Sequence, residues 1–140
     1  MKMYVVGFLF SIDLKKVVLI EKNKPAWQKG KLNGVGGKVN EGEAPIDAMH
    51  REFKEEAGVS GIEWKNFHLI FGKDWEVWFF RAFVPMSVIW SVSTMESERV
   101  VVVDMGDFHK LPLINNLHWL IPMANSTEYV HGNSVKEYEE

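Results

Sequence analysis

The chain has 140 residues, of which 46% are hydrophobic and 25% are charged, and its formal net charge is -3. This is the composition of a globular protein, and the length suits one core, so we expect a single domain over residues 1–140. The small negative charge argues against a protein that binds duplex nucleic acid through its phosphates. The absence of cysteine excludes disulfides and thiolate zinc sites and is typical of a reducing compartment. No secretion signal or membrane-length apolar run is evident, so we predict a cytoplasmic protein without a membrane partner.

Two strands are predicted at the start of the chain. Tyr4–Phe10 is rich in β-branched and aromatic residues, which is typical of a buried strand. A turn near Asp13 separates it from a second apolar run, Lys16–Glu21. The two runs predict a hairpin.

The segment that follows, Asn23–Asn33, is predicted to be a basic loop. Its sequence is NKPAWQKGKLN, and further lysines stand at its two ends. Next to a site for a polyphosphate, such lysines become candidate phosphate contacts, and we select Lys22 and Lys38.

Three glycines come next, in the segment NGVGGK. Gly34, Gly36 and Gly37 carry no side chain, so the backbone here can approach a ligand or a metal closely. We therefore expect a loop that offers main-chain atoms to a site.

A helix is predicted over Ala44–Ala57. Pro45 suits its first turn, where the missing N–H would have no partner, and Gly58 suits the left-handed residue that ends a helix. At 3.6 residues per turn, four apolar residues form one stripe that faces the core. They are Ile46, Met49, Phe53 and Ala57.

Three glutamates lie on a neighbouring face of this helix. Glu52, Glu55 and Glu56 are spaced i, i+3 and i+4, so their charges repel one another. Hard divalent cations such as Mg2+ and Mn2+ prefer carboxylate oxygens and commonly complete their shell with water and substrate phosphate. The cluster predicts a Mg2+ or Mn2+ site and a phosphorylated small-molecule substrate.

Two further strands are expected after the helix, at Trp64–Gly72 and Glu76–Pro85, joined by a tight turn. Their apolar density predicts a sheet that is covered on both faces. The tryptophans of this region are candidates for stacking on a base, although aromatic residues in strands more often belong to the core. These candidates are Trp75, Trp78 and Trp90.

The last third of the chain begins with a polar loop, Trp90–Arg99, that carries Glu96 and Glu98. Either glutamate is a candidate for a further metal ligand. A strand is predicted at Val100–Asp104 and a helix at about Leu113–Asn125, with Pro122 breaking or kinking its last turn. The final residues, 129–140, are predicted to be a polar tail that can end in a short strand.

One longer pattern unites the glycine segment and the helix. Residues 37–59 match G-x5-E-x7-R-E-U-x-E-E-x-G-U, where U is apolar, at every position. The matching residues are Gly37, Glu43, Arg51, Glu52, Phe53, Glu55, Glu56, Gly58 and Val59. By this pattern the chain resembles the Nudix hydrolases, which implies an α/β/α sandwich around a mixed sheet. It also implies hydrolysis of a nucleoside diphosphate linked to another moiety, with Mg2+ or Mn2+.

The resemblance implies a role for each matched residue. Glu52, Glu55 and Glu56 would hold the metal, together with the carbonyl of Gly37 and, from the later loop, Glu98. Arg51 would orient a glutamate, and Glu43 would join the glycine segment to the helix. The general base would be Glu52, with Glu98 or Glu96 as the alternative.

The substrate is implied by residues outside the pattern. KLNGVGGKVNEGE resembles MutT-type enzymes, especially the oxidised purine nucleoside triphosphatases, and there Asn33 matches an asparagine that contacts the base. Asn115 resembles a second one, and an amide can donate and accept at a purine edge. The resemblance thus implies hydrolysis of a nucleoside triphosphate, such as 8-oxo-dGTP, to the monophosphate and pyrophosphate. The alternatives are another nucleotide conjugate (ADP-ribose, a dinucleoside polyphosphate, a nucleotide sugar or an RNA cap) and a non-catalytic nucleotide sensor. Both a monomer and a homodimer fit.

Overall fold

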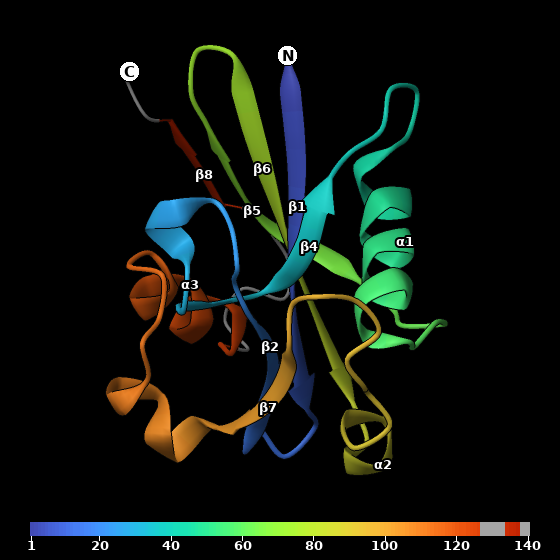
Figure 1. Ribbon diagram of the computed structural model, residues 1–140, viewed down its shortest axis with the longest axis vertical. Coiled ribbons are helices and arrows are strands. Elements are labelled where there is room, and N and C mark those ends of the chain that lie inside the picture. The colour runs from blue at the N-terminus through green and yellow to red at the C-terminus, as the bar shows by residue number, and fades with distance from the viewer. Residues whose placement is uncertain (127–133, 138–140) are drawn as a thin grey trace.

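A mixed β-sheet lies between helices in the computed structural model, which describes residues 1–126 and 134–137 (Figure 1). The elements in chain order are β1 (Lys2–Ser11), β2 (Lys16–Glu21), the 3-10 helix η1 (Ala26–Gln28), β3 (Leu32–Asn33), β4 (Val35–Lys38), α1 (Pro45–Ala57), β5 (Lys65–Phe71), β6 (Trp75–Val84), α2 (Met86–Ile89), β7 (Val100–Asp104), the 3-10 helix η2 (Met105–Lys110), α3 (Leu117–Ala124) and β8 (Ser134–Glu137).

The sheet contains eight strands within the described residues. Its main order is β3-β2-β1-β6-β5-β8, with β4 paired to β1 and β7 paired to β2. The pairs β1–β6 and β5–β8 are parallel, and the other pairs are antiparallel. The long strand β1 is central, because it pairs with β6 on one side and with β2 and β4 on the other.

Alternation along the strands creates two cores, one on each face of the sheet. In β1, Val5 and Leu9 are fully buried in the core that α1 and α2 cover, while Phe8 and Phe10 are fully buried in the core that α3 covers. Successive side chains of a strand point to opposite faces, so an apolar run such as this one needs cover on both. The observed architecture is therefore the predicted α/β/α sandwich.

The predicted strands and the predicted helix are confirmed with small changes of boundary. Lys16–Glu21 and Val100–Asp104 are strands over the predicted ranges. Helix α1 begins at Pro45 and ends before Gly58, which has φ 79° and donates its N–H to the carbonyl of Lys54 at 3.0 Å. Of the predicted tail, β8 is a strand, and residues 129–133 and 138–140 lie outside the described residues.

Most of the glycine segment is a strand, with Gly34 between β3 and β4, so the prediction of a loop there was wrong. β4 runs antiparallel to β1 and pairs Gly36 with Val6 and Gly37 with Val5. A Cβ at Gly36 would overlap the carbonyl oxygen of Val5, so glycine permits this close approach.

The helix predicted at Leu113–Asn125 was also too long, because α3 begins only at Leu117. Before it, the chain is extended and pairs with β3: Leu113 forms a parallel bridge with Leu32, and Ile114 donates its N–H to the carbonyl of Leu32 at 3.0 Å. This pairing brings the residues just before α3 close to the end of β3. Among the described residues, no helix is long and apolar enough to cross a membrane.

Candidate active site

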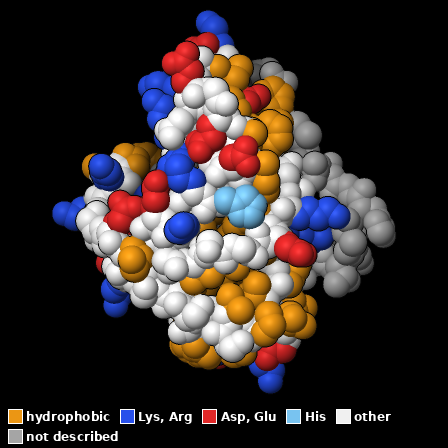
Figure 2. Space-filling view, turned by 90° about the vertical axis from the view of Figure 1, so that its right-hand side faces the viewer, with side chains coloured by type: hydrophobic (Ala, Val, Ile, Leu, Met, Phe, Trp, Pro, Cys, Tyr) orange, Lys and Arg blue, Asp and Glu red, His pale blue; other side chains and the backbone are white. Residues whose placement is uncertain are grey.

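Helix α1 presents its glutamates along the edge of its packed face. Met49, Phe53 and Ala57 are fully buried against the sheet, as the predicted stripe requires, and Phe53 packs edge-on against Trp64 with ring centroids 5.1 Å apart. Figure 2 shows this side of the molecule, where acidic side chains alternate with basic ones instead of forming one continuous acidic patch. The acidic face of the helix is thus partly neutralised by the protein's own cations.

Arg51 is the cation at the centre of this face. Its guanidinium donates two hydrogen bonds of 2.9 Å to the carboxylate of Glu43 and one of 2.9 Å to the carbonyl of Lys38. It also donates to Glu52 at 2.9 Å and to Glu55 at 3.3 Å. These bonds join the end of β4, the loop before α1 and the helix itself, so Arg51 fixes the positions of the carboxylates that it contacts.

Gly37 and Glu52 lie against each other across the space between β4 and α1. A Cβ at Gly37 would lie 2.5 Å from the carboxyl carbon of Glu52, so a side chain at this position would displace the carboxylate. Burial raises the pKa of Glu52, and the hydrogen bond and charge of Arg51 offset only part of that rise. The main chain of β4 and a desolvated carboxylate therefore lie next to each other.

Glu56 has a strongly perturbed carboxyl group. Its Oε2 atom is buried and has no hydrogen-bond partner among the described residues. Burial raises the pKa of Glu56 to about 8, and the charge of Glu52 adds to the rise. Lys22 opposes the rise, and Glu98 and Glu96 contribute to it more weakly.

The loop before β7 brings Glu98 near the carboxyl group of Glu56. The main-chain N–H groups of Ser93 and Met95 donate to the last carbonyls of α1, and so hold the loop against the helix. Glu98 is only 9% exposed and accepts hydrogen bonds from the N–H of Asn23 at 2.6 Å and from Lys22 at 3.0 Å. Burial opposes ionisation, but these bonds outweigh it and lower the pKa of Glu98 below its ordinary value. Glu96 is exposed, so Glu98 is the better-placed member of the predicted pair.

The fit of these residues to a divalent cation rests on the orphaned oxygen of Glu56. A buried carboxylate oxygen without a donor, close to the negative charges of Glu52 and Glu98, is an arrangement that a hard cation stabilises. The donor set is all oxygen, as Mg2+ and Mn2+ prefer. Within residues 1–126 and 134–137, however, no three acidic or histidine side chains already stand in a ligating arrangement. Arg51 instead donates to one oxygen of Glu52 and one of Glu55, so an ion would be held by the other oxygen of each carboxylate.

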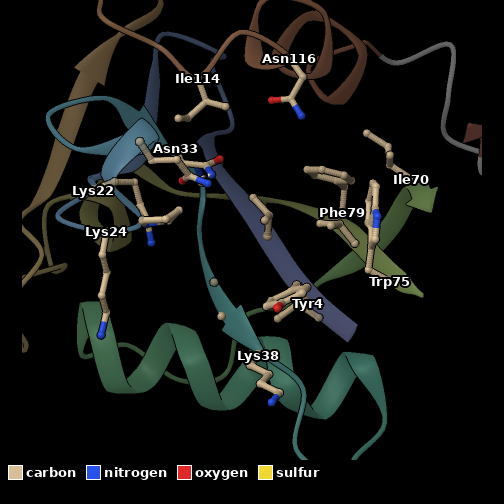
Figure 3. Close-up of a pocket in the computed structure, with 18 of the residues that line it drawn as sticks. Tyr4, Lys22, Lys24, Asn33, Lys38, Ile70, Trp75, Phe79, Ile114 and Asn116 are labelled. Carbon is tan, nitrogen blue, oxygen red and sulfur yellow. Dashed lines mark hydrogen bonds between the residues drawn. The ribbon is translucent and has the colours of Figure 1, made fainter. Parts of the chain in front are cut away.

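A cavity of about 770 Å3 opens beside this cluster (Figure 3). One end lies next to α1 and is lined by Lys22, Lys24 and Lys38, together with the glycines of β4. The far end is lined by apolar and amide side chains. These are Asn33, Ile70, Trp75, Phe79, Ile114 and Asn116. The cavity therefore has a cationic end at the carboxylate cluster and an apolar end with hydrogen-bonding groups, which is a lining typical of small-molecule sites.

Three of the four residues predicted to bind substrate line the cavity: Lys22, Lys38 and Asn33. Asn115 does not. It is exposed, and its neighbour Asn116 lines the far end, with a buried Oδ1 atom that has no hydrogen-bond partner among the described residues. The two asparagines are adjacent in sequence, and the pairing of Ile114 with Leu32 decides which one faces the cavity.

Of the three tryptophans predicted as candidates for stacking, one lines the cavity. Trp75 lines the cavity, but Trp78 packs against the core under α1, and Trp90 is 62% exposed and is not among the lining residues. Three aromatic residues that were not predicted also line the cavity: Tyr4, Phe79 and, on η1, Trp27. For Trp27, the only available signal was its place in a loop rich in lysine.

Comparisons with solved structures show the same fold in several proteins. One is a MutT from work on Aliivibrio salmonicida and Vibrio cholerae (19% identity, 89% of this chain and 96% of that chain covered, TM-score 0.71). Another is the Nudix domain of Shewanella oneidensis NrtR in complex with ADP-ribose (17%, 87% and 84%, TM-score 0.74). A third is a MutT protein from Bacillus halodurans (15%, 99% and 90%, TM-score 0.70). At such identities, these likenesses show the fold alone.

Comparison of the sequence with family models identifies the family of the chain. No curated protein matches the chain. The family model described as the NUDIX domain matches residues 1–114, which include the complete pattern at 37–59 and all the carboxylates of the cluster. The chain belongs to the Nudix family.

Proposed function

We propose that this protein is a Mg2+- or Mn2+-dependent pyrophosphohydrolase of nucleoside triphosphates that releases the monophosphate and pyrophosphate. The observation that carries the proposal is the polarity of the cavity. Its cationic end adjoins the carboxylates of α1, and its far end combines apolar walls with two amide side chains. A triphosphate at the first end and a purine at the second would match both.

We assign the metal-binding role to the carboxylates of Glu52, Glu55, Glu56 and Glu98 and the carbonyl of Gly37. When bound, the cation would neutralise phosphate charge and acidify a water molecule. Lys22 and Lys38 line the same end and add positive charge for the phosphates. Arg51 orients Glu52, our first candidate for the base, through the hydrogen bond between them. Glu98 is the second candidate.

The nucleobase would be recognised at the far end of the cavity. Asn33 donates to Gln28 at 3.4 Å, and its Oδ1 accepts from the N–H of Gly34 at 2.8 Å, so its amide orientation is set before any ligand enters. Asn116 lines the same end, and its amide group can both donate and accept at the edge of a base. A purine, including an oxidised purine, presents both donors and acceptors at its edge and suits this pair.

A second candidate substrate is a nucleoside diphosphate conjugate such as ADP-ribose. The observation in its favour is the fold of the NrtR Nudix domain, which was solved with ADP-ribose, together with a cavity of about 770 Å3. A domain of this fold that binds a nucleotide without cleaving it is the non-catalytic alternative.

A substrate panel separates these candidates. Product formation should be followed with Mg2+ and with Mn2+ for canonical and 8-oxo purine triphosphates, ADP-ribose and dinucleoside polyphosphates. We expect triphosphates to be cleaved to the monophosphate and pyrophosphate, and the double variant Glu55→Gln/Glu56→Gln to lose this activity. Cleavage of the conjugates alone would refute the triphosphatase proposal, and unchanged activity of the double variant would refute the metal assignment.

A further inference from the structure

Trp27 packs little against the rest of the fold but lines the cavity. It remains 64% exposed, and η1 has no buried residue. A single exposed aromatic residue is unremarkable by itself. An exposed indole at the mouth of a nucleotide-sized cavity, however, offers an open π-face to whatever enters.

The turn that carries Trp27 is held in place by its own hydrogen bonds. Lys22 donates its N–H to the carbonyl of Lys31 at 2.9 Å, and its carbonyl accepts from Gly30 at 2.8 Å, which closes the base of the loop. Within the loop, Gln28 donates its N–H to the carbonyl of Pro25 at 2.9 Å. Trp27 therefore lies on a turn that hydrogen bonds define. It is next to Gln28, whose side-chain amide contacts Asn33.

The cavity wall formed by β5 and β6 suits one face of a flat ring. Trp75 and Phe79 from β6 and Ile70 from β5 form an apolar surface, and Asn33 and Asn116 also line the cavity, where their amides could bond to the edge of a base (Figure 3). A base bound there has one face on the sheet and the other toward the mouth. Stacking an aromatic side chain on that second face removes it from water.

We propose that Trp27 stacks on the outer face of the nucleobase and encloses it against the apolar wall formed by β5 and β6. This inference rests on the proposed function, because it needs a nucleotide in the cavity. Every base has a π-face, so stacking tolerates different bases. Trp27 therefore sets the affinity for any nucleobase, and the amides of Asn33 and Asn116 set the preference among bases.

The test measures dissociation constants with Mg2+ for nucleoside monophosphates, which contain no anhydride to cleave, and for pyrophosphate, which contains no base. The ligands are AMP, GMP, UMP and pyrophosphate, and the proteins are wild type, Trp27→Ala, Trp27→Phe and Trp90→Ala. Trp90 is the matched control, since it is 62% exposed and does not line the cavity. We expect Trp27→Ala to bind the three monophosphates roughly 5- to 150-fold more weakly, with their ranking unchanged. Trp27→Phe should keep most of the affinity, and pyrophosphate binding should not change.

The outcomes separate this inference from the proposed function. If wild type binds monophosphates and Trp27→Ala binds them equally well, the stacking role is refuted and the proposed function stands. If Trp27→Ala weakens pyrophosphate as much as the monophosphates, the substitution has disturbed the loop and the stacking role is again refuted. If wild type neither binds monophosphates nor cleaves any nucleotide of the panel, the proposed function fails and the inference fails with it.

Discussion

Replacing Glu56 with glutamine should stabilise the metal-free protein at alkaline pH. In the folded state, burial and the charge of Glu52 raise the pKa of Glu56 from its ordinary 4.5 to about 8. Below pH 4.5 the carboxyl group is protonated in the folded and the unfolded states, so it costs nothing. As the pH rises toward 8, the unfolded chain loses the proton and the folded protein resists losing it, so the free energy of unfolding of wild type falls. Glutamine keeps the shape and removes this dependence.

The size of the effect follows from the shift of the pKa. A shift from 4.5 to about 8, at about 1.4 kcal/mol per pH unit, sets an upper limit of about 5 kcal/mol. The side chain is only partly buried, so water screens its charge, and we expect about 1 to 2 kcal/mol. A divalent cation should reverse the order, because it binds the carboxylate of wild type and stabilises the folded state by mass action.

The assay is urea unfolding of wild type and Glu56→Gln at pH 5 and at pH 8.5, with chelator and with Mg2+. Glu63→Gln, which alters an exposed glutamate outside the cluster, is the matched control. With chelator, Glu56→Gln should gain about 1 to 2 kcal/mol relative to wild type between the two pH values, and Glu63→Gln should gain nothing. If the stabilities of wild type and Glu56→Gln respond equally to pH, the conclusion that the carboxyl group of Glu56 is buried without a partner is refuted. An equal response of the two to Mg2+ would refute its role as a ligand.

Two further substitutions test the support of the site. Arg51→Lys should lower kcat by about 10- to 100-fold, because an ammonium group cannot replace the forked contacts to Glu43 and Glu52, whereas Lys54→Ala on the same helix should leave kcat unchanged; full activity of Arg51→Lys would contradict the orienting role. Phe53→Ala should lower the free energy of unfolding by about 3 to 5 kcal/mol in urea, because Phe53 is fully buried, and Phe83→Ala, at a side chain 40% exposed, should cost less. A loss below about 1 kcal/mol for Phe53→Ala would show that α1 does not depend on this contact.

The features that the sequence predicted well are those that depend on neighbours along the chain. The spacing of Glu52, Glu55 and Glu56 places them on one face of any helix, and Pro45 and Gly58 mark its ends wherever it packs. Apolar runs such as Lys16–Glu21 make strands for a similarly local reason. The complete pattern at residues 37–59 therefore identified the family and the carboxylate face of the helix without any knowledge of the sheet.

The features that only the tertiary structure decided depend on partners far along the chain. Gly36 and Gly37 have little strand preference of their own and form a strand because β1 pairs with them. Glu98 reaches Glu56 because its loop bonds both to α1 and to Asn23, and no spacing in the sequence encodes that meeting.

The far end of the cavity shows most clearly which features are local and which depend on distant partners. The sequence determined that asparagines and tryptophans were available, and Asn33, one of the residues predicted to bind substrate, lines the cavity. It did not distinguish Asn116 from Asn115, or Trp27 from Trp90, because the direction of a side chain at the end of an element depends on what that element pairs with. The bridge between Leu32 and Leu113 and the hydrogen bonds that close the loop at Lys22 made those choices. The local pattern at residues 37–59 thus determined the family, and long-range pairing decided which side chains line the cavity.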